Sequence, residues 1–465
     1  MSHPSRYLLE RAWVDGAVRD SVLVEIRDGR FTRVEPGLGG RSLDWAGVAT
    51  AAQSQNHRPA GDSWDSPTQI PGLTIPGLAN AHSHAFHRAL RGRTQRGRGS
   101  FWTWREQMYA VADRLDPDSY LALATAVYRE MAAAGITTVG EFHYLHHDPA
   151  GRRYADPNAM GHALVEAARG AGIRIALLDT CYLSGGFGAP PEGVQRRFCD
   201  GDAETWAERV AALAHTGDED DAVIGAAVHS VRAVPAEQIP TVVAAARGGP
   251  LHVHLSEQPR ENQECLAAYS LTPTQLLHDQ GALGPMTTAV HATHLGTDDV
   301  DRLGGTSTAV CLCPTTERDL GDGIGPSRAL HDAGARLTLG SDSHAVIDPF
   351  EEMRGMELDE RLATGQRGHW RAEDLLAAAT AHGILGFPDA GAIRVGQRAD
   401  MVTLDLEGPR TAGTGADEQT VVFAASAADV VQTVAAGRVV YSRDEERADR
   451  AIGRSLEEAI GRVLG

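Results

Sequence analysis

The chain has 465 residues, of which 42% are hydrophobic and 23% are charged, and its formal net charge is −19. This length fits one large domain of about 250–300 residues with a smaller one beside it. The acidic balance argues against nucleic acid and anionic membranes as partners, and no apolar run approaches the ~20 residues of a membrane span. The first residues lack the apolar core of a signal peptide, so we expect a cytoplasmic protein.

The N-terminal part of the chain is typical of short β-strands and turns. Residues that favour strands concentrate at 7–13, 21–27 and 31–34. Asp28-Gly29, between the last two of these segments, is a dipeptide that favours a hairpin turn. Residues 36–70 are rich in Gly, Ser, Pro and Asp without periodicity, which predicts a long surface loop.

The middle of the chain alternates short apolar runs with helical stretches such as 119–134 and 160–171. The runs lie at residues 73–84, 137–144, 173–182, 222–231, 251–257, 287–294, 308–314 and 336–344. Eight apolar strands separated by helices indicate a parallel sheet, and eight is the number that closes a TIM barrel. A doubly wound open sheet ranks behind, because no GxGxxG motif follows the first strand.

The C-terminal part of the chain mirrors the N-terminal part. Residues 399–406 and 429–441 are strand-like, and an amphipathic helix is expected over 455–464. We therefore predict an α/β fold that consists of a (β/α)8 TIM barrel over 76–385 and a small β-sandwich domain built from 1–75 and 386–465.

Polar side chains lie near the C-terminal ends of these runs, where barrel enzymes have their active sites. His82 and His84 are two residues apart on a strand, so both side chains point to one face. His254 ends the fifth run and Asp342 lies near the end of the eighth. Three imidazoles and one carboxylate suit a first-row divalent metal with one coordination position left for water. We expect zinc, with Fe²⁺ as the alternative.

Two further residues near the strand ends fit the catalytic roles that such a metal requires. Glu257 follows His254 by three residues, where a carboxylate can take a proton from water that a metal activates. His291, near the end of the sixth run, can polarise the group under attack, and His294 on the same run is the alternative. The competing interpretation of Glu257 is a solvated or helix-capping carboxylate.

The chain contains no lysine, so all 43 basic residues are arginines. Two-metal hydrolases built on such barrels commonly bridge their ions with a carboxylated lysine, which this chain cannot supply. The fourth run ends in His229 and Arg232 rather than in an acid. We therefore predict one metal ion per chain, an arrangement that goes with deamination more often than with ring-amide or phosphoester hydrolysis.

The chain resembles the formimidoylglutamate deiminase family of the amidohydrolase superfamily. The segments that carry the resemblance are PGLANAHSHAFHRAL, SFWTWREQMY, GITTVGEFHYLHHDPAGRRYADP, SGGFG with QRRF, AVHSVRAVP, HLSEQPREN, AVHATH, LCPTTERDLGDGIGP and GSDSH. The resemblance implies zinc ligands at His82, His84, His254 and Asp342, with Glu257 and His291 as the catalytic pair and Asp342 helping to orient the reaction. It also implies substrate contacts at Tyr144, His229, Arg232 and Arg105, and a homodimer.

The implied reaction is hydrolysis of N-formimino-L-glutamate to N-formyl-L-glutamate and ammonia, a step of histidine degradation. An acidic protein must meet two substrate carboxylates with fixed arginines, and Arg232 and Arg105 are placed for this. The competing interpretation of Arg232 is a structural ion pair with a rim acid such as Asp148, Asp156 or Glu317. The chain departs from the family at His87, where glutamine is usual, and at Arg318-Asp319, where Ala-Asn is usual. His87 is expected to line the substrate pocket.

Three other functions stay open from the sequence. The chain could deaminate another amidine, such as guanine or a related heterocycle, although a flat ring would need stacking groups more than arginines. It could be a barrel that binds metal without catalysis, although Glu257 and all four ligands are present. An amide-bond hydrolase is disfavoured by the missing lysine.

Overall fold

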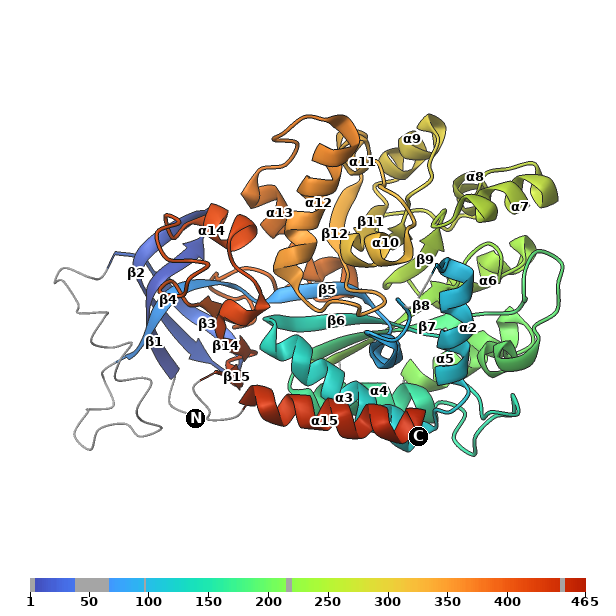
Figure 1. The fold of residues 1–465 in the computed structure, drawn as a ribbon, viewed down its shortest axis with the longest axis horizontal. Coiled ribbons are helices and arrows are strands. Elements are labelled where there is room, and N and C mark those ends of the chain that lie inside the picture. Colours follow the sequence, from blue (N-terminus) through green and yellow to red (C-terminus); the bar gives the residue numbers. More distant parts are fainter. Residues whose placement is uncertain (1–4, 38–66, 96–97, 215–219, 444–447) are drawn as a thin grey trace.

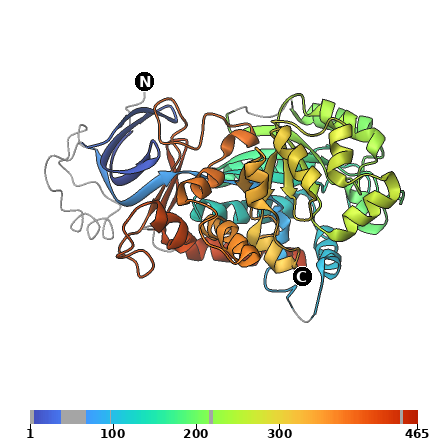
Figure 2. The same ribbon diagram turned by 90° about the horizontal axis from the view of Figure 1, so that it is seen from above.

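The computed structural model describes residues 5–37, 67–95, 98–214, 220–443 and 448–465. Most of the long loop expected over 36–70 lies outside these residues. Within them the strands form two sheets, which lie side by side with the mixed sheet at one end of the molecule (Figures 1 and 2). None of the described helices is long and apolar enough to cross a membrane.

The larger sheet consists of eight parallel strands in sequential order, which confirms the predicted barrel. Its strands are β5 (Leu78–Ser83), β6 (Ile136–His143), β7 (Arg174–Cys181), β8 (Ala222–Val228), β9 (Leu251–Leu255), β10 (Thr287–His291), β11 (Ala309–Leu312) and β12 (Arg336–Leu339). The amide of Asp342 donates to the carbonyl of His82 at 3.0 Å, and the amide of His84 donates to the carbonyl of Asp342 at 3.3 Å. These bonds join the segment after β12 to β5 and bring three predicted ligands together where the barrel closes.

Helices connect successive strands and cover the outside of the barrel (Figure 1). They are α3 (Pro117–Ala133), α4 (Ala159–Ala171), α5 (Ala203–Ala214), α6 (Ile239–Ala245), α7 (Pro259–Tyr269), α8 (Pro273–Asp279), α9 (Thr297–Gly305), α10 (Pro314–Leu320), α11 (Ser327–Asp332), α12 (Pro349–Thr364) and α13 (Ala372–Ala379). Short 3-10 helices add to the loops at η1 (Ala85–Leu90), η2 (Gly193–Phe198), η3 (Ala236–Gln238) and η4 (His382–Leu385). The helix α2 (Phe101–Ala112) stands apart from this layer, next to the C-terminal ends of the strands.

The smaller sheet is mixed and has seven strands in the order β15-β14-β13-β4-β1-β2-β3. The N-terminal part supplies β1 (Ser5–Val14), β2 (Ala17–Arg27), β3 (Arg30–Glu35) and β4 (Thr68–Pro76). The C-terminal part supplies β13 (Met401–Leu404), β14 (Val430–Ala435) and β15 (Arg438–Ser442), together with α14 (Glu418–Phe423) and η5 (Ala427–Asp429). The second domain expected from both chain ends is therefore present, while its exact boundaries stay predictions.

The run over residues 73–84 divides between the two sheets, although the sequence pattern predicts one strand. The break falls at Gly77, where an added Cβ would lie 2.5 Å from Thr137 Oγ1 and 2.7 Å from Asp400 Cβ. Only glycine fits this close approach, so the chain can pass directly from the mixed sheet into the barrel.

The terminal helix α15 (Ala448–Leu464) begins earlier than the sequence pattern predicts. It packs against α3 on the outside of the barrel (Figure 1). Leu456, Ala459 and Val463, at helical spacing, form the buried face of this contact.

Candidate metal and substrate site

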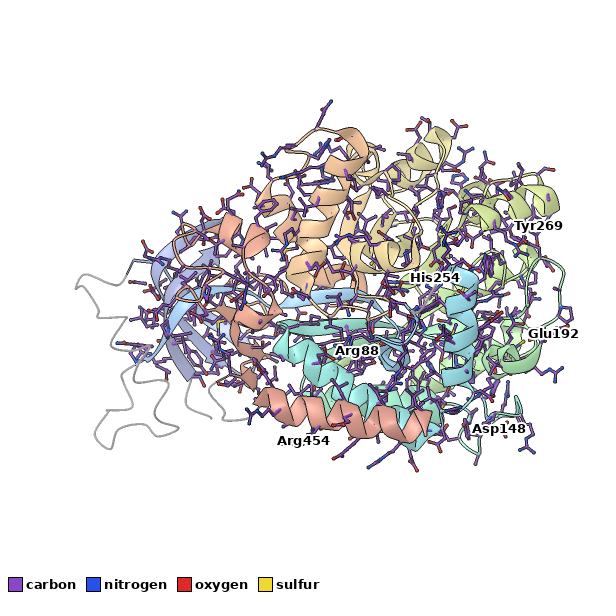
Figure 3. The ribbon with its side chains drawn as sticks, in the orientation of Figure 1. Arg88, Asp148, Glu192, His254, Tyr269 and Arg454 are labelled. Atoms are coloured by element: carbon purple, nitrogen blue, oxygen red, sulfur yellow. The ribbon has the colours of Figure 1, made fainter. Side chains whose placement is uncertain are left out.

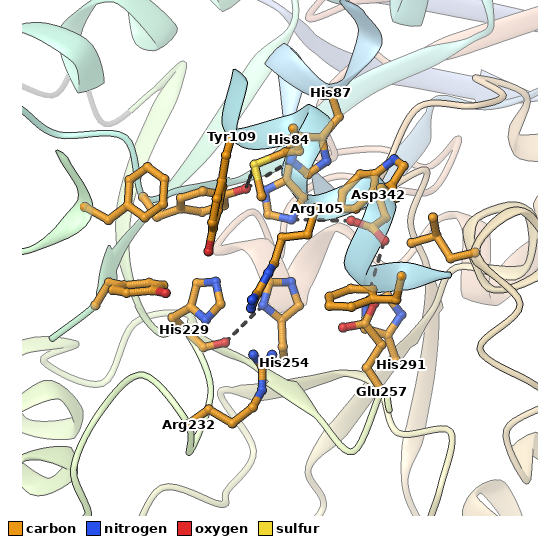
Figure 4. Close-up of a pocket in the computed structure, with 17 residues that line it drawn as sticks. His84, His87, Arg105, Tyr109, His229, Arg232, His254, Glu257, His291 and Asp342 are labelled. Atoms are coloured by element: carbon orange, nitrogen blue, oxygen red, sulfur yellow. Dashed lines mark hydrogen bonds and ion pairs between the residues drawn. The ribbon is translucent and has the colours of Figure 1, made fainter. Parts of the chain in front are cut away.

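A pocket opens at the C-terminal ends of the barrel strands, with an empty volume of about 580 Å³ that includes its mouth. Figure 3 shows His254 at this end of the barrel, beside α2 and away from the mixed sheet. The pocket is lined by most of the residues that the sequence singled out: His84, His87, Arg105, Tyr144, His229, Arg232, His254, Glu257, His291 and Asp342 (Figure 4). His82 lies just beneath it and is fully buried.

The predicted metal ligands converge on the Asp342 carboxylate. Its Oδ1 lies 3.4 Å from His82 Nε2 and 3.3 Å from His84 Nε2. The Nε2 atoms of His82 and His254 lie 3.1 Å apart. Two groups of donors close enough to share one ion meet at this carboxylate: His82, His254, His291 and Asp342, and separately His84, His87 and Asp342. The geometry therefore joins the predicted set into one cluster and adds His291 and His87 to its edge.

Backbone hydrogen bonds decide which ring nitrogens face the centre of this cluster. His84 Nδ1 donates to the carbonyl of Phe142 at 2.9 Å, and His254 Nδ1 donates to the carbonyl of His229 at 3.0 Å. Because Nδ1 carries the proton, the Nε2 lone pairs of His84 and His254 point inward. Inward lone pairs beside a carboxylate repel one another unless a cation lies between them, so these residues fit a metal ion.

Burial keeps these imidazoles neutral, as metal ligands must be. It lowers the pKa of His84 to about 3 and holds the pKa of His254 well below its usual range. Burial also opposes ionisation of Asp342, but the surrounding histidines outweigh it and depress the pKa of this carboxyl. The cluster therefore contains neutral donors and one fixed negative charge.

Three functional positions sit on backbone that side chains rarely adopt. The φ angles of Ser256, His291 and Asp342 are 50°, 68° and 38°, in the left-handed region. Such conformations cost on the order of 1 kcal/mol each and persist where the surrounding structure imposes them. Here the hydrogen bond from the Asp342 amide to β5, and one from the Ala292 amide to the carbonyl of Leu255 at 3.0 Å, hold the turns.

His291 and Glu257 lie on the opposite side of the cluster from His84. His291 Nε2 is 3.8 Å from Glu257 Oε1 and 3.7 Å from Asp342 Oδ2, and its Nδ1 is 3.4 Å from Glu317 Oε1. Burial disfavours a charged ring, but the three carboxylates outweigh it and raise the pKa of His291 well above its usual value. Burial also raises the pKa of Glu257 to about 7. This pair therefore holds the exchangeable protons of the site.

A buried glutamate under the His-x-His motif holds that motif in place. Glu141 accepts from the Ser83 hydroxyl at 2.5 Å and from the Ala85 amide at 2.6 Å. Both donors flank His84, so this carboxylate fixes the turn in which the two ligand rings diverge. Glu141 belongs to the EFHY segment, but nothing in the sequence pattern predicts this role.

Arg232 is partly buried at the pocket wall, where its Nε donates to Glu261 Oε2 at 2.7 Å. The competing interpretation of Arg232 was an ion pair with Asp148, Asp156 or Glu317. None of these is its partner, because the ion pair is made by Glu261 at the start of α7. The other Glu261 oxygen accepts from the Ser256 amide at 2.9 Å. One carboxylate thus orients both the loop of Glu257 and the arginine.

Arg105 lies on α2, on the other side of the pocket. Its guanidinium is 4.5 Å from the Trp102 ring centroid and 5.5 Å from that of Tyr109. No carboxylate pairs with Arg105 within the described ranges. Arg105 and Arg232 point toward one another across the pocket (Figure 4). Arg232 has Glu261 as its ion-pair partner, so an anion bound between the two guanidinium groups would balance the charge of Arg105.

His87 and Tyr144 form a hydrogen-bonded pair at the pocket wall, with His87 Nε2 3.0 Å from the Tyr144 hydroxyl. Burial and the neighbouring His84 hold the pKa of His87 well below its usual range. His229 lies nearby, and burial and Arg232 lower its pKa in the same way. All three side chains are therefore neutral groups in the pocket. His294 faces elsewhere and hydrogen-bonds the carbonyl of Asp322 at 2.8 Å, which leaves His291 as the histidine in the pocket.

A second buried cluster of histidine and carboxylate lies outside the pocket. It contains His143, His146 and Asp179, whose side-chain donors also approach closely enough to share one ion. Here Arg209 donates to both Asp179 oxygens, at 2.9 and 2.8 Å. Trp206 Nε1 donates to the same carboxylate at 2.9 Å.

Several residues of the pocket were not predicted from the sequence. Tyr109, Tyr182 and Phe198 line the pocket, and Glu261 orients Arg232. Tyr109 and Phe198 lie in segments that carried the family resemblance, SFWTWREQMY and QRRF. Their spacing gives no indication that α2 and η2 meet at the barrel mouth.

An eight-stranded barrel with a buried cluster of histidine and aspartate at the C-terminal ends of its strands defines a metal-dependent hydrolase. A profile of the Amidohydrolase family matches residues 73–440, and the chain belongs to this family. It is 37% identical to a formimidoylglutamate deiminase of Pseudomonas aeruginosa, over 86% of this chain and 91% of that protein.

Two solved structures share the fold over almost their whole length. One is an amidohydrolase from Brucella melitensis, 29% identical with a TM-score of 0.85 over 100% of both chains. The other is an adenosine deaminase from Xanthomonas campestris with bound zinc, 21% identical with a TM-score of 0.80 over 98% of both chains.

Proposed function

We propose that this protein is a deiminase that hydrolyses N-formimino-L-glutamate to N-formyl-L-glutamate and ammonia. The observation that carries the proposal is the pair of arginines, Arg105 and Arg232, that face each other across a pocket with the His/Asp cluster at one side. The substrate has two carboxylates and one amidine, which matches two cations and one hydrolytic centre. The similarity to the formimidoylglutamate deiminase of P. aeruginosa supports the same substrate.

The metal in this proposal is one zinc ion, held by His82, His84, His254 and Asp342. His291 is less suited as a ligand, because carboxylate oxygens face both of its nitrogens and favour the protonated ring. The zinc bound to the solved adenosine deaminase supports the choice of metal. When bound, such an ion lowers the pKa of water toward ~7 and so supplies a nucleophile at neutral pH.

The chain's own groups bind the substrate, orient it and move protons. Arg105 and Arg232 bind carboxylates, and bidentate pairing would fix the direction of the amidine. Glu257 takes one proton from water as a C–O bond forms at the amidine carbon and gives it to the terminal nitrogen. It then moves the hydroxyl proton to the same nitrogen as the C–N bond breaks and the carbonyl forms, so both hydrogens of water leave in ammonia. His291, whose Nε2 lies 3.8 Å from Glu257 and 3.7 Å from Asp342, orients the tetrahedral carbon together with Asp342. The balance is one water consumed and one ammonia released.

The direct test is ammonia release by zinc-loaded protein from N-formimino-L-glutamate, with guanine and adenosine as competing amidines. We expect ammonia and N-formyl-L-glutamate in a 1:1 ratio and at least 100-fold higher kcat/KM than for either heterocycle. This ratio corresponds to ~2.7 kcal/mol, a modest part of what two desolvated charge pairs contribute. Faster release from guanine or adenosine would replace this proposal by the heterocycle alternative.

A further inference from the structure

We infer that Gln195 turns the hydroxyl groups of Tyr109 and Tyr182 toward the pocket, and that these three residues form a binding site for a substrate carboxylate beside Arg105. The inference rests on the proposed function, because it names further groups that recognise the same anionic substrate. It also gives a role to the QRRF segment, which lies on η2.

The direction of the Gln195 amide follows from its surroundings. Its Oε1 accepts from the backbone amide of Glu192 at 2.9 Å. A backbone N–H can only donate, so this contact fixes the oxygen on the Glu192 side and the nitrogen on the other side. Nε2 then donates to the Tyr182 hydroxyl at 3.0 Å and to the Tyr109 hydroxyl at 3.2 Å.

The hydrogens of this group can be counted. Both Nε2 hydrogens are used on the tyrosine oxygens, so each hydroxyl accepts from Gln195 and still has its own hydrogen to give. Burial raises the pKa of Tyr182, and the contact with the Tyr109 hydroxyl reinforces this. If one hydroxyl donates to the other, one hydrogen is left over. No acceptor for it occurs among the described residues, and both tyrosines line the pocket.

Charges around the tyrosines select a carboxylate as the acceptor. The positive charges of Arg105 and Arg232 lower the pKa of Tyr182 against the larger effect of burial. The Arg105 guanidinium also lies over the Tyr109 ring, 5.5 Å from its centroid. Two cations with one spare O–H donor form a complete set for a carboxylate oxygen. A neutral heterocycle would leave Arg105 without a counter-ion.

The segment around Gln195 also positions the helix that carries Arg105 and Tyr109. The Arg197 guanidinium is buried and donates to the carbonyls of Ala112, at the end of α2, and of Leu115, the latter at 2.6 Å. It also donates to the carbonyl of His147 at 2.9 Å. The same short helix therefore anchors α2 and sets the direction of the hydroxyl groups.

The SGGFG segment makes room for the amide. An added Cβ on Gly185 would lie 2.9 Å from Gln195 Oε1 and 2.5 Å from the carbonyl oxygen of Pro190. A side chain at this position would displace Gln195. The SGGFG and QRRF segments, both outside the metal cluster, therefore determine the position of the Gln195 amide together.

The test compares Gln195→Met and Gln195→Glu. Methionine removes the donors, so the hydroxyls lose their fixed direction, and kcat/KM for N-formimino-L-glutamate should fall about 5–10-fold through KM. Glutamate is closer in shape but accepts from both hydroxyls and turns them away, so we expect a larger loss, about 100-fold. For N-butylformamidine, which has no carboxylate, kcat/KM should change less than threefold in both variants. Gln366→Met, at an exposed position, is the matched control.

A purely structural role gives a different pattern. It predicts that glutamate, the closer isostere, lowers kcat/KM less than methionine does, that kcat/KM falls equally for both substrates, or that zinc content falls. Any of these results would overturn the inference. In a background with both tyrosines changed to phenylalanine, Gln195→Met should have no further effect, and an unchanged loss would also overturn it.

Calorimetry with N-formyl-L-glutamate separates this inference from the proposed function. If the wild-type protein releases no ammonia from N-formimino-L-glutamate, the proposed function fails. Binding of N-formyl-L-glutamate that weakens in Gln195→Glu would still support the carboxylate site. If the wild-type protein is active but binding and KM are unchanged in both variants, the inference fails and the proposed function stands.

Discussion

Two buried clusters in this protein contain the same types of residue but have different surroundings. In the pocket, histidines surround Asp342, and no arginine pairs with this carboxylate within the described ranges. Behind β6 and β7, His143 and His146 approach Asp179, but Arg209 and Trp206 already occupy its oxygens. Free donors and an unbalanced negative charge are what metal binding requires, and of these two clusters only the one in the pocket has both.

The arginine accounts for this difference. Arg209 also lies 2.9 Å from Asp200, which is 3.3 Å from His147. Arg153 lies 3.3 Å from the same Asp200, so two guanidinium groups balance the two carboxylates, and a further cation would meet repulsion. The pocket cluster has its arginines at a distance, facing the space for a substrate. We therefore assign chemistry to the first cluster and stability to the second.

The largest expected effect concerns the proton carrier of the pocket. Glu257→Gln keeps the shape but cannot take a proton, so kcat on N-formimino-L-glutamate should fall by ~10²–10⁴-fold. Zinc content should not change, because Glu257 is outside the proposed ligand set. The matched control is Glu264→Gln, a partly exposed glutamate on α7. Turnover within threefold of the wild type would remove Glu257 from the mechanism.

The second prediction concerns stability rather than turnover. Asp179→Asn leaves Arg209 without its closest partner and should lower the free energy of unfolding by about 3–5 kcal/mol in urea titrations. Zinc content of the folded protein should be unchanged. Asp301→Asn, at an exposed position on α9, serves as the control. A fully stable Asp179→Asn variant that has lost zinc would reverse the two assignments.

Acid should reduce this stability difference. Burial raises the pKa of Asp179, but Arg209 and the histidines outweigh it and lower the pKa to about 2. A depressed pKa means that the stabilisation is complete above the ordinary value of ~4 and is lost as the pH falls toward 2. The difference between wild type and Asp179→Asn should therefore be constant from pH 7 to 5 and shrink below pH 4. A constant difference down to pH 2 would contradict the assigned ion pair.

A smaller effect is expected at the arginine of the pocket. Arg232→Met should lower kcat/KM for N-formimino-L-glutamate about 30–100-fold, because a charge-assisted contact to a carboxylate is lost. N-butylformamidine should be affected far less. The ion pair with Glu261 gives the competing outcome. If Arg232 only supports the Glu257 loop through Glu261, kcat/KM should fall equally for both substrates.

The barrel and its metal cluster could be predicted because they follow local rules. His82 and His254 lie on strands whose apolar pattern is strong, and the C-terminal ends of parallel strands meet at one rim. His84 was expected on the same strand as His82, but β5 ends at Ser83 and His84 is the first residue after it. Asp342 lies just after a strand with the same pattern. The division of residues 73–84 between two sheets also escaped this reasoning, because it depends on a close contact at Gly77.

The other side of the pocket could not be predicted in the same way. Gln195 and Glu261 act through contacts between segments far apart in the chain, such as η2 with α2 and α7 with the turn after β8. No periodicity connects them. Arg232 was expected at the rim, but its ion-pair partner Glu261 lies on α7, which no sequence pattern connects with the turn after β8.

The most direct measurement is the zinc content of purified, zinc-loaded protein and of one variant from each cluster. The account predicts one ion per chain for the wild type and for Asp179→Asn, and loss of that ion in His254→Asn. It also predicts that ammonia release from N-formimino-L-glutamate disappears with the ion. Two tightly held ions in the wild type, or loss of the ion in Asp179→Asn with retention in His254→Asn, would contradict it.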